Sequence, residues 1–257
     1  MSNLFNFKRF SLLFKKHSVE NYKAYLLLIV VFFGIVALLI GLMTEMGTQI
    51  ITLNTQAITF MLLMQLAGTI FTSNIFANLG DKRKAIATLV LPASTFEKFL
   101  VGWLYSYVFF QVVFTVVFYT VVWAFLRLHN SAPLLNVFSD KQHFHPGLYI
   151  AYLFYAFLNA IAIYGAVYFK KMHFIKIAFI FFVTVCIIWL GNDALLHAMI
   201  HQHVTNPPFT GLSLWTNDGF YNVVASNQSN QLVCVMFALL SCIIWTATYF
   251  KLKEKQI

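Results

Sequence analysis

The sequence is poor in charged residues, which make up 10% of its 257 residues, whereas a soluble domain carries about 25%. A helix of about 20 apolar residues crosses a hydrocarbon core of about 30 Å. Five stretches of at least that length contain no Asp, Glu, Lys or Arg, namely 24–44, 46–80, 99–126, 142–169 and 219–250. A sixth, 177–192, becomes long enough if Lys176 extends its ammonium group to the interface. These runs exclude a soluble globular protein.

Cysteine and the common enzyme motifs are also scarce. The three cysteines, Cys186, Cys234 and Cys242, all fall within apolar runs, which excludes a secreted disulfide framework. The sequence contains no G-x-x-x-x-G-K-[ST], no H-E-x-x-H and no G-x-S-x-G. We therefore expect no enzymatic activity and no cofactor in this chain, and any ATP would be bound by another polypeptide.

The apolar segments have the pattern of helices. Unpaired amides in lipid are costly, so only helices or closed barrels span a membrane, and the strict alternation of a barrel strand is missing from LLLIVVFFGIVALLI at 26–40. We predict an all-α membrane protein with one transmembrane domain, 1–257. Its six spans are predicted at 25–43, 55–76, 97–126, 147–169, 173–191 and 232–250, with an outer segment at 192–231.

Lysine and arginine predict the orientation of these spans. Fifteen of the 17 basic residues fall in the two termini and in the loops after spans 2 and 4, and only Arg127 and Lys141 lie on the other side. Cytoplasmic loops carry such an excess, so both termini are predicted to be cytoplasmic, in the inner (plasma) membrane. The net charge of +9 is explained by this topology and does not indicate a nucleic-acid partner.

Two segments outside the spans have distinct patterns. Residues 1–23 form a basic amphipathic stretch, which we call the elbow; Phe7, Phe10 and Phe14 share one side of a helix and would anchor it at the membrane interface. In the outer segment, Asn192 or Asp193 would cap a short helix, and the aromatic residues and glycines that follow suit a segment that dips back into the membrane interface. An ordinary juxtamembrane anchor and a packed outer loop remain alternatives for the two segments.

The stretch DKRKAIATLVLPASTFEKFL at 81–100 is unusual between two spans. Asp81 can cap a helix of about two turns, and Pro92 ends it. Ser94 and Glu97 have the spacing of a capping box that starts the next helix. The pattern predicts a short rigid surface helix, because a flexible linker would be rich in Gly and Ser.

This stretch resembles the permease subunit of ABC-2-type ABC transporters, through its cationic helix followed by LPAS (91–94) and EKF (97–99). The elbow, the six spans and the outer segment match the layout of that family, although Lys-Ala-Ile stands where the family often has Gly-Thr-Leu. The resemblance implies a cytoplasmic coupling helix that docks on a separate ATPase subunit, which binds ATP and Mg. It also implies a second permease copy or paralogue in the bilayer. The docking residues would be Lys82, Arg83, Lys84, Thr88 and Leu91.

A basic loop with a proline can also serve topology alone, so that alternative for residues 81–100 stays open.

The spans carry neutral polar side chains, not ionisable ones, near their middles: Gln65, Asn74, Gln111 and Asn159. Ion-coupled carriers place ionisable groups at that depth, so an external energy source is favoured. The four residues would either form interhelical hydrogen bonds or line a substrate path.

Six of the eight histidines lie in the predicted outer loops, and His197 and His201 would share a helix face. Imidazoles suit transition metals, so the alternative function is a membrane enzyme or sensor with an outer metal site; surface histidines without a metal are the simpler interpretation. The metal site predicts stoichiometric zinc or copper in the purified protein, lost on His197→Ala and His201→Ala. A scaffold without transport activity is a third alternative.

Overall fold

The computed structural model describes residues 5–45, 53–80, 93–128, 147–169, 173–200, 212–216, 219–223 and 227–254. Six of its helical segments are long and apolar enough to cross a membrane, which confirms the predicted all-α, six-span membrane protein. The helices are α1 (Phe7–Glu45), α2 (Leu53–Gly80), α4 (Thr95–Trp103), α5 (Phe110–Leu128), α6 (Gly147–Tyr168), α7 (His173–Ile200) and α8 (Asn227–Glu254). The π-helical segment η1 (Leu104–Phe109) joins α4 to α5, so that span 3 is continuous.

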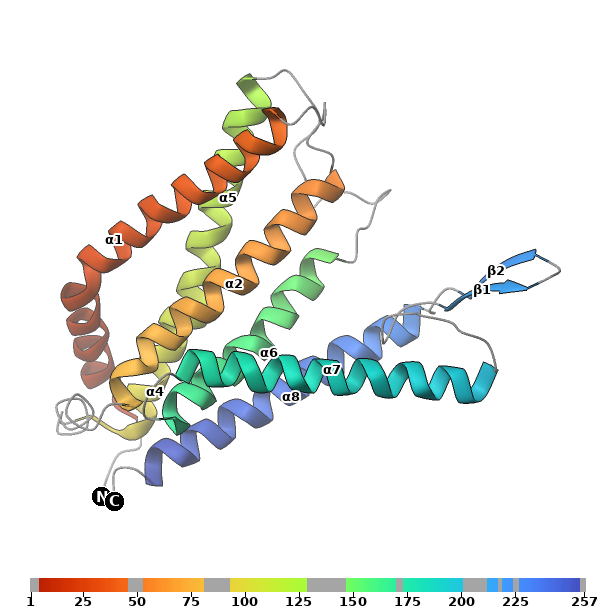
Figure 1. The fold of residues 1–257 in the computed structure, drawn as a ribbon. Coiled ribbons are helices and arrows are strands. Elements are labelled where there is room, and N and C mark those ends of the chain that lie inside the picture. Colours follow the sequence, from red (N-terminus) through yellow and green to blue (C-terminus); the bar gives the residue numbers. More distant parts are fainter. Residues whose placement is uncertain are drawn as a thin grey trace.

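The helices alternate in direction, as a chain that crosses a membrane six times requires. Figure 1 shows both chain termini at one end of the molecule, together with the start of α4 and the ends of α2, α6 and α8. We call this the N/C end. Helices α1, α2, α5 and α6 extend from it as one group, and α7 and α8 lead away from that group toward a short β-hairpin.

Helix α1 is too long to be a membrane span alone. Its 39 residues extend about 58 Å at 1.5 Å per residue, nearly twice the thickness of a hydrocarbon core. Its first turns, drawn in dark red in Figure 1, run at an angle to the remainder and lie at the N/C end. Residues 7–23 and span 1 therefore belong to one helix with a change of direction.

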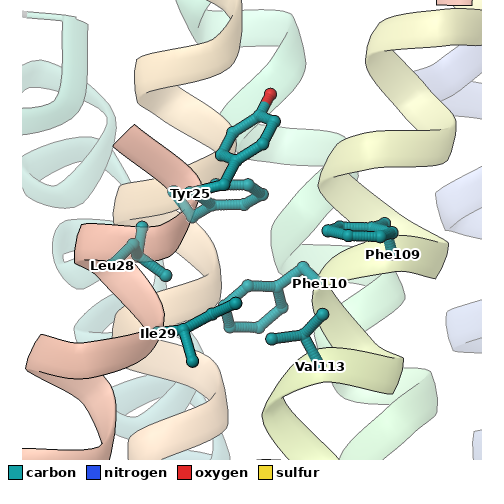
Figure 2. Close-up of a pocket in the computed structure, with 7 residues that line it drawn as sticks. Tyr25, Leu28, Ile29, Phe109, Phe110 and Val113 are labelled. Carbon is teal, nitrogen blue, oxygen red and sulfur yellow. The ribbon is translucent and has the colours of Figure 1, made fainter. Parts of the chain in front are cut away.

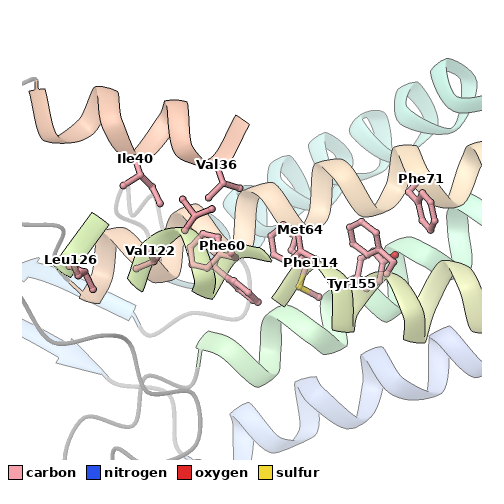
Figure 3. Packing of buried hydrophobic residues seen from close by; sticks show 12 residues of the cluster. Val36, Ile40, Phe60, Met64, Phe71, Phe114, Val122, Leu126 and Tyr155 are labelled. Atoms are coloured by element: carbon pink, nitrogen blue, oxygen red, sulfur yellow. The ribbon is translucent and has the colours of Figure 1, made fainter. Parts of the chain in front are cut away.

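A core of aromatic side chains holds α1, α2, α5 and α6 together. Phe110, Phe114 and Phe118 are spaced four residues apart on α5, and neighbouring rings stack at centroid distances of 5.8 and 6.1 Å. Phe60 of α2 packs against this row, 5.2 Å from Phe114 and 5.1 Å from Phe118, and Figure 3 shows Phe60 and Phe114 between the helices. A second buried cluster lies nearer the N/C end and contains Phe76, Phe99, Ile163, Ala166, Val167 and Leu252.

Helix α7 differs from the others because its span buries none of its residues inside the molecule. It approaches α6 near its start, where a Cβ on Gly165 would lie 2.1 Å from the side chain of Ile177. Farther along, Phe182, Ile187 and Leu190 are more than 60% exposed. A helix that is apolar on all sides is typical of a membrane environment.

The segment after span 5 differs from the expectation of a separate short helix. Helix α7 continues to Ile200 without interruption at Asn192 or Asp193. These residue types favour helix caps, but they also occur inside a helix when their side chains do not compete for its backbone hydrogen bonds. Strands β1 (Leu212–Thr216) and β2 (Gly219–Val223) then form an antiparallel hairpin that the sequence analysis did not predict.

The contact between α2 and α6 provides a test of this packing. A Cβ on Gly68 would lie 2.1 Å from Cε2 of Tyr155 and 2.8 Å from Cε1 of Phe110, so Gly68→Ala has to push the helices apart. We expect a loss of about 1–3 kcal/mol, measured as a lower midpoint of thermal unfolding in detergent.

Gly34→Ala is the matched control, because nothing lies within 4 Å of a Cβ at that position. Alanine is the better helix former by about 1 kcal/mol, so this variant should unfold at the same or a higher temperature. Equal losses in the two variants would contradict the close approach of α2 and α6.

Candidate functional site

The predicted docking residues Lys82, Arg83, Lys84, Thr88 and Leu91 lie outside the described residues. The structure does describe the place at which this stretch enters span 3. Ser94 is the N-cap of α4, with φ −68° and ψ 154°. Its hydroxyl accepts a hydrogen bond from the backbone N–H of Glu97 at 3.2 Å, and Oε2 of Glu97 accepts one from the N–H of Ser94 at 2.9 Å. The predicted capping box is confirmed.

The same carboxylate also holds the start of α1. Asn6 is the residue before this helix, and its side-chain Oδ1 accepts a hydrogen bond from the N–H of Lys8 at 3.0 Å, the geometry of an N-cap. The backbone N–H of Asn6 donates to Oε1 of Glu97 at 2.7 Å. In an ordinary capping box this N–H is satisfied by the third residue of its own helix, but that residue is Arg9. Glu97 therefore acts as the missing acidic partner from another helix.

Hydrogen bonds and nearby positive charge favour an ionised Glu97, although burial alone would favour the neutral form. Its side chain is 0% exposed, and a buried carboxylate is tolerated only when it is paired and hydrogen-bonded. Arg9 donates from Nη2 to Oε1 at 3.3 Å. The starts of two helices add the positive ends of their dipoles. We call Glu97, Asn6, Arg9 and Ser94 the Glu97 junction.

Farther along, the first turns of α1, which we call the N-terminal helix, pack on span 3 through aromatic rings. Phe14 stacks on Tyr105 of η1 at 4.8 Å between centroids, and His17 lies 4.6 Å from the same ring. The hydroxyl groups of Ser18 and Tyr105 share a hydrogen bond, and Nε2 of His17 is 2.7 Å from the hydroxyl of Tyr25. One face of the elbow is therefore occupied by contacts within the chain.

The three aromatic residues predicted to anchor the elbow have different surroundings. Phe7 is 73% exposed, Phe10 lies between Phe7 and Phe14 at centroid distances of 6.4 and 6.3 Å, and Phe14 contacts Tyr105. Anchoring in the membrane stays a prediction for all three.

The π-helical segment η1 changes the hydrogen bonding of span 3. The N–H of Phe110, which an α-helix would give to the carbonyl of Ser106, points to the carbonyls of Tyr105 and Tyr107. The hydroxyl of Tyr155, on α6, donates to the Ser106 carbonyl at 2.6 Å instead. An unsatisfied carbonyl inside a membrane is costly, so Tyr155 allows the π segment to exist there. Such segments are rare and frequent at functional sites.

Two of the four predicted mid-span polar residues form interhelical hydrogen bonds. Asn159 is fully buried, donates from Nδ2 to Thr72 Oγ1 at 2.8 Å, and accepts at Oδ1 from Trp245 Nε1 at 3.3 Å. Gln65 donates to the carbonyl of Ala151 at 2.9 Å. These bonds join α2, α6 and α8.

The other two polar residues are more accessible. Asn74, on α2, is exposed, and Gln111, on α5, is half-buried. The structure therefore does not gather the four residues into one site. A crevice does lie between α1 and α5, but apolar and aromatic side chains form its walls; Figure 2 shows Leu28 and Ile29 of α1 facing Phe109, Phe110 and Val113 across it.

The candidate histidine site is described only in part. His197 is exposed on α7, and His201 lies outside the described residues. Within the described ranges, no three His, Cys, Asp or Glu side chains form a group that could hold a metal ion.

Asn6, Arg9 and Tyr105 were not identified from the sequence. Asn6 has a local signal, because an Asn before a helical pattern is a typical N-cap; the partners of Arg9 and Tyr105 lie nearly 90 residues away and leave no such signal.

No family model, curated protein or solved structure matches this chain.

The hydrogen bond from Tyr155 to η1 can be tested by Tyr155→Phe, which removes only the hydroxyl. Interhelical hydrogen bonds in membranes average about 0.6 kcal/mol and reach about 1.7, and we expect a loss at the upper end because the buried hydroxyl contacts both the Ser106 carbonyl and Thr72. Thermal unfolding in detergent measures it. Tyr164→Phe, on the same helix and 37% exposed, is the control, and equal midpoints for the two variants would contradict the role of Tyr155.

Proposed function

We propose that this protein is the permease subunit of an ATP-driven exporter of the ABC-2 type. A separate ATPase subunit would bind ATP and Mg and dock on the 82–91 helix, and a second permease copy or a paralogue would complete the path across the membrane. The observation that carries the proposal is the Glu97 junction. It holds the start of span 3 rigidly, immediately after the stretch that resembles a coupling helix.

A rigid start suits a helix that receives force from a partner. Two reciprocal hydrogen bonds fix the first turn of α4, and the buried carboxylate of Glu97 connects this turn to the N-terminal helix. A push on the preceding stretch would then move span 3 as a rod and would not be absorbed by unwinding of its first turn. A loop that served topology alone would not require this connection to the N-terminal helix.

The sequence supports an external energy source. The motif of a P-loop ATPase is missing from the chain, and the long apolar runs carry no Asp, Glu, Lys or Arg that could couple transport to protons or sodium. The excess of lysine and arginine at the two termini and in the loops after spans 2 and 4 supports an N/C end in the cytoplasm, where an ATPase subunit would be found.

The polar residues of the spans divide into two groups under this proposal. Gln65 and Asn159 hold helices together through interhelical hydrogen bonds, and their replacement would affect stability first. Gln111 is half-buried and is the better candidate for a residue of the substrate path, together with exposed Asn74.

The docking assignment predicts that Arg83→Glu together with Lys84→Glu abolishes co-purification of the partner ATPase. Two basic contacts become repulsive, and removing one partner of a charge pair at an interface costs about 2–5 kcal/mol, enough for a more than tenfold loss of affinity. Co-purification of an ABC ATPase subunit from the native membrane, with the permease as bait, measures the effect.

Lys251→Glu together with Lys253→Glu is the control, since these lysines lie near the C-terminus at the same N/C end and the change in charge is equal. This variant should retain the ATPase. If the Arg83 and Lys84 variant also retains it, the 82–91 helix is not the docking site.

A further inference from the structure

The N-terminal helix and span 3 run side by side from a common starting point. Asn6 and Arg9 contact Glu97, and eight residues farther along span 3, Phe14 and Ser18 contact Tyr105. Eight residues of helix cover about 12 Å. A polar contact and an aromatic contact therefore fix the same two segments at two separate levels.

We propose that Glu97 is a positioning residue that holds the N-terminal helix, residues 6–18, against the start of span 3, residues 94–105, so that the two move as one unit. This role of Glu97 involves only contacts within this chain and needs no partner subunit. Its use in transport rests on the proposed function, in which a partner subunit displaces the start of span 3 and the N-terminal helix follows.

A carboxylate is required because each of its two oxygens accepts from a different helix start. Oε2 serves Ser94 of the chain's own α4, and Oε1 serves Asn6 and Arg9. A glutamine side chain has one acceptor oxygen and one amide nitrogen that only donates. Glutamine can satisfy a capping box, but its nitrogen would then face the N–H of Asn6, which is also a donor.

Two substitutions therefore separate the two functions of the junction. Glu97→Gln keeps the capping box of α4 and breaks the hydrogen bonds to Asn6 and Arg9. Ser94→Ala removes the hydroxyl that caps α4 and leaves the carboxylate in contact with Asn6 and Arg9. Arg9→Gln removes the charged partner from the other side and provides an independent variant.

The test uses the full-length permease in lipid nanodiscs, with spin labels on Leu12→Cys and Val112→Cys, two exposed positions on α1 and α5. The native cysteines are replaced by alanine, at Cys186, Cys234 and Cys242. Electron–electron double resonance then reports the distance between the N-terminal helix and span 3. The unmodified junction should give one narrow distance distribution.

Glu97→Gln and Arg9→Gln should add a second, longer distance, with about a tenfold increase in the undocked population, the loss expected for one charge-assisted hydrogen bond. Ser94→Ala should lower the thermal midpoint and keep the narrow distribution. An unchanged distribution in Glu97→Gln would overturn the proposal, and so would equal broadening in Glu97→Gln and Ser94→Ala, which would mean a general loss of helix structure.

The transport role has its own measurement. Stimulation of the partner's ATPase activity by the permease should fall at least severalfold in Glu97→Gln while the two subunits still co-purify. Undiminished stimulation together with undocking would overturn the claim that the N-terminal helix follows span 3 in function. A permease that binds no ATPase would count against the proposed function alone, because the distance measurement needs no partner.

Discussion

The carboxylate of Glu97 is the point at which the starts of two helices meet. Each helix start exposes N–H groups without partners inside its own helix, and two such starts at one place would repel each other without a shared acceptor. Glu97 supplies that acceptor from a fully buried position, and Arg9 offsets its charge. The direction of the elbow and its aromatic contact with Tyr105 both follow from this common origin.

Hydrogen bonds from side chains of one helix to groups of another determine how the spans pack. The π segment η1 leaves the Ser106 carbonyl to Tyr155, and this bond requires α6 to lie close to span 3. Gly68 permits the same approach from α2, because a larger residue would collide with Tyr155. The buried pair of Thr72 and Asn159 completes the connection between α2 and α6. The packing of the middle of the bundle is thus set by one irregular turn and the side chains that satisfy it.

A feature could be predicted from the sequence when the residues that determine it lie close together along the chain. The six spans follow from uncharged runs, and the capping box follows from Ser94 and Glu97, three residues apart, so both were predictable. The hydrogen bond between Asn6 and Glu97 joins residues 91 positions apart, and no local sequence pattern predicts it. The end of α7 was misplaced because Asn192 and Asp193 are typical capping residues, yet here they lie inside a continuous helix. The π segment carries no known sequence signal.

The π segment has a consequence for the ancestry of span 3. A π turn contains one residue more than the α turn it replaces, and one residue corresponds to about 100° of rotation around a helix axis. The π turn absorbs that residue, so deleting a single residue between 104 and 109 would restore an ordinary α turn and keep Phe110, Phe114 and Phe118 facing the core. A related protein without this residue could keep the same aromatic row, so a one-residue alignment gap here would mark the loss of the π turn and of the need for a Tyr155 hydroxyl.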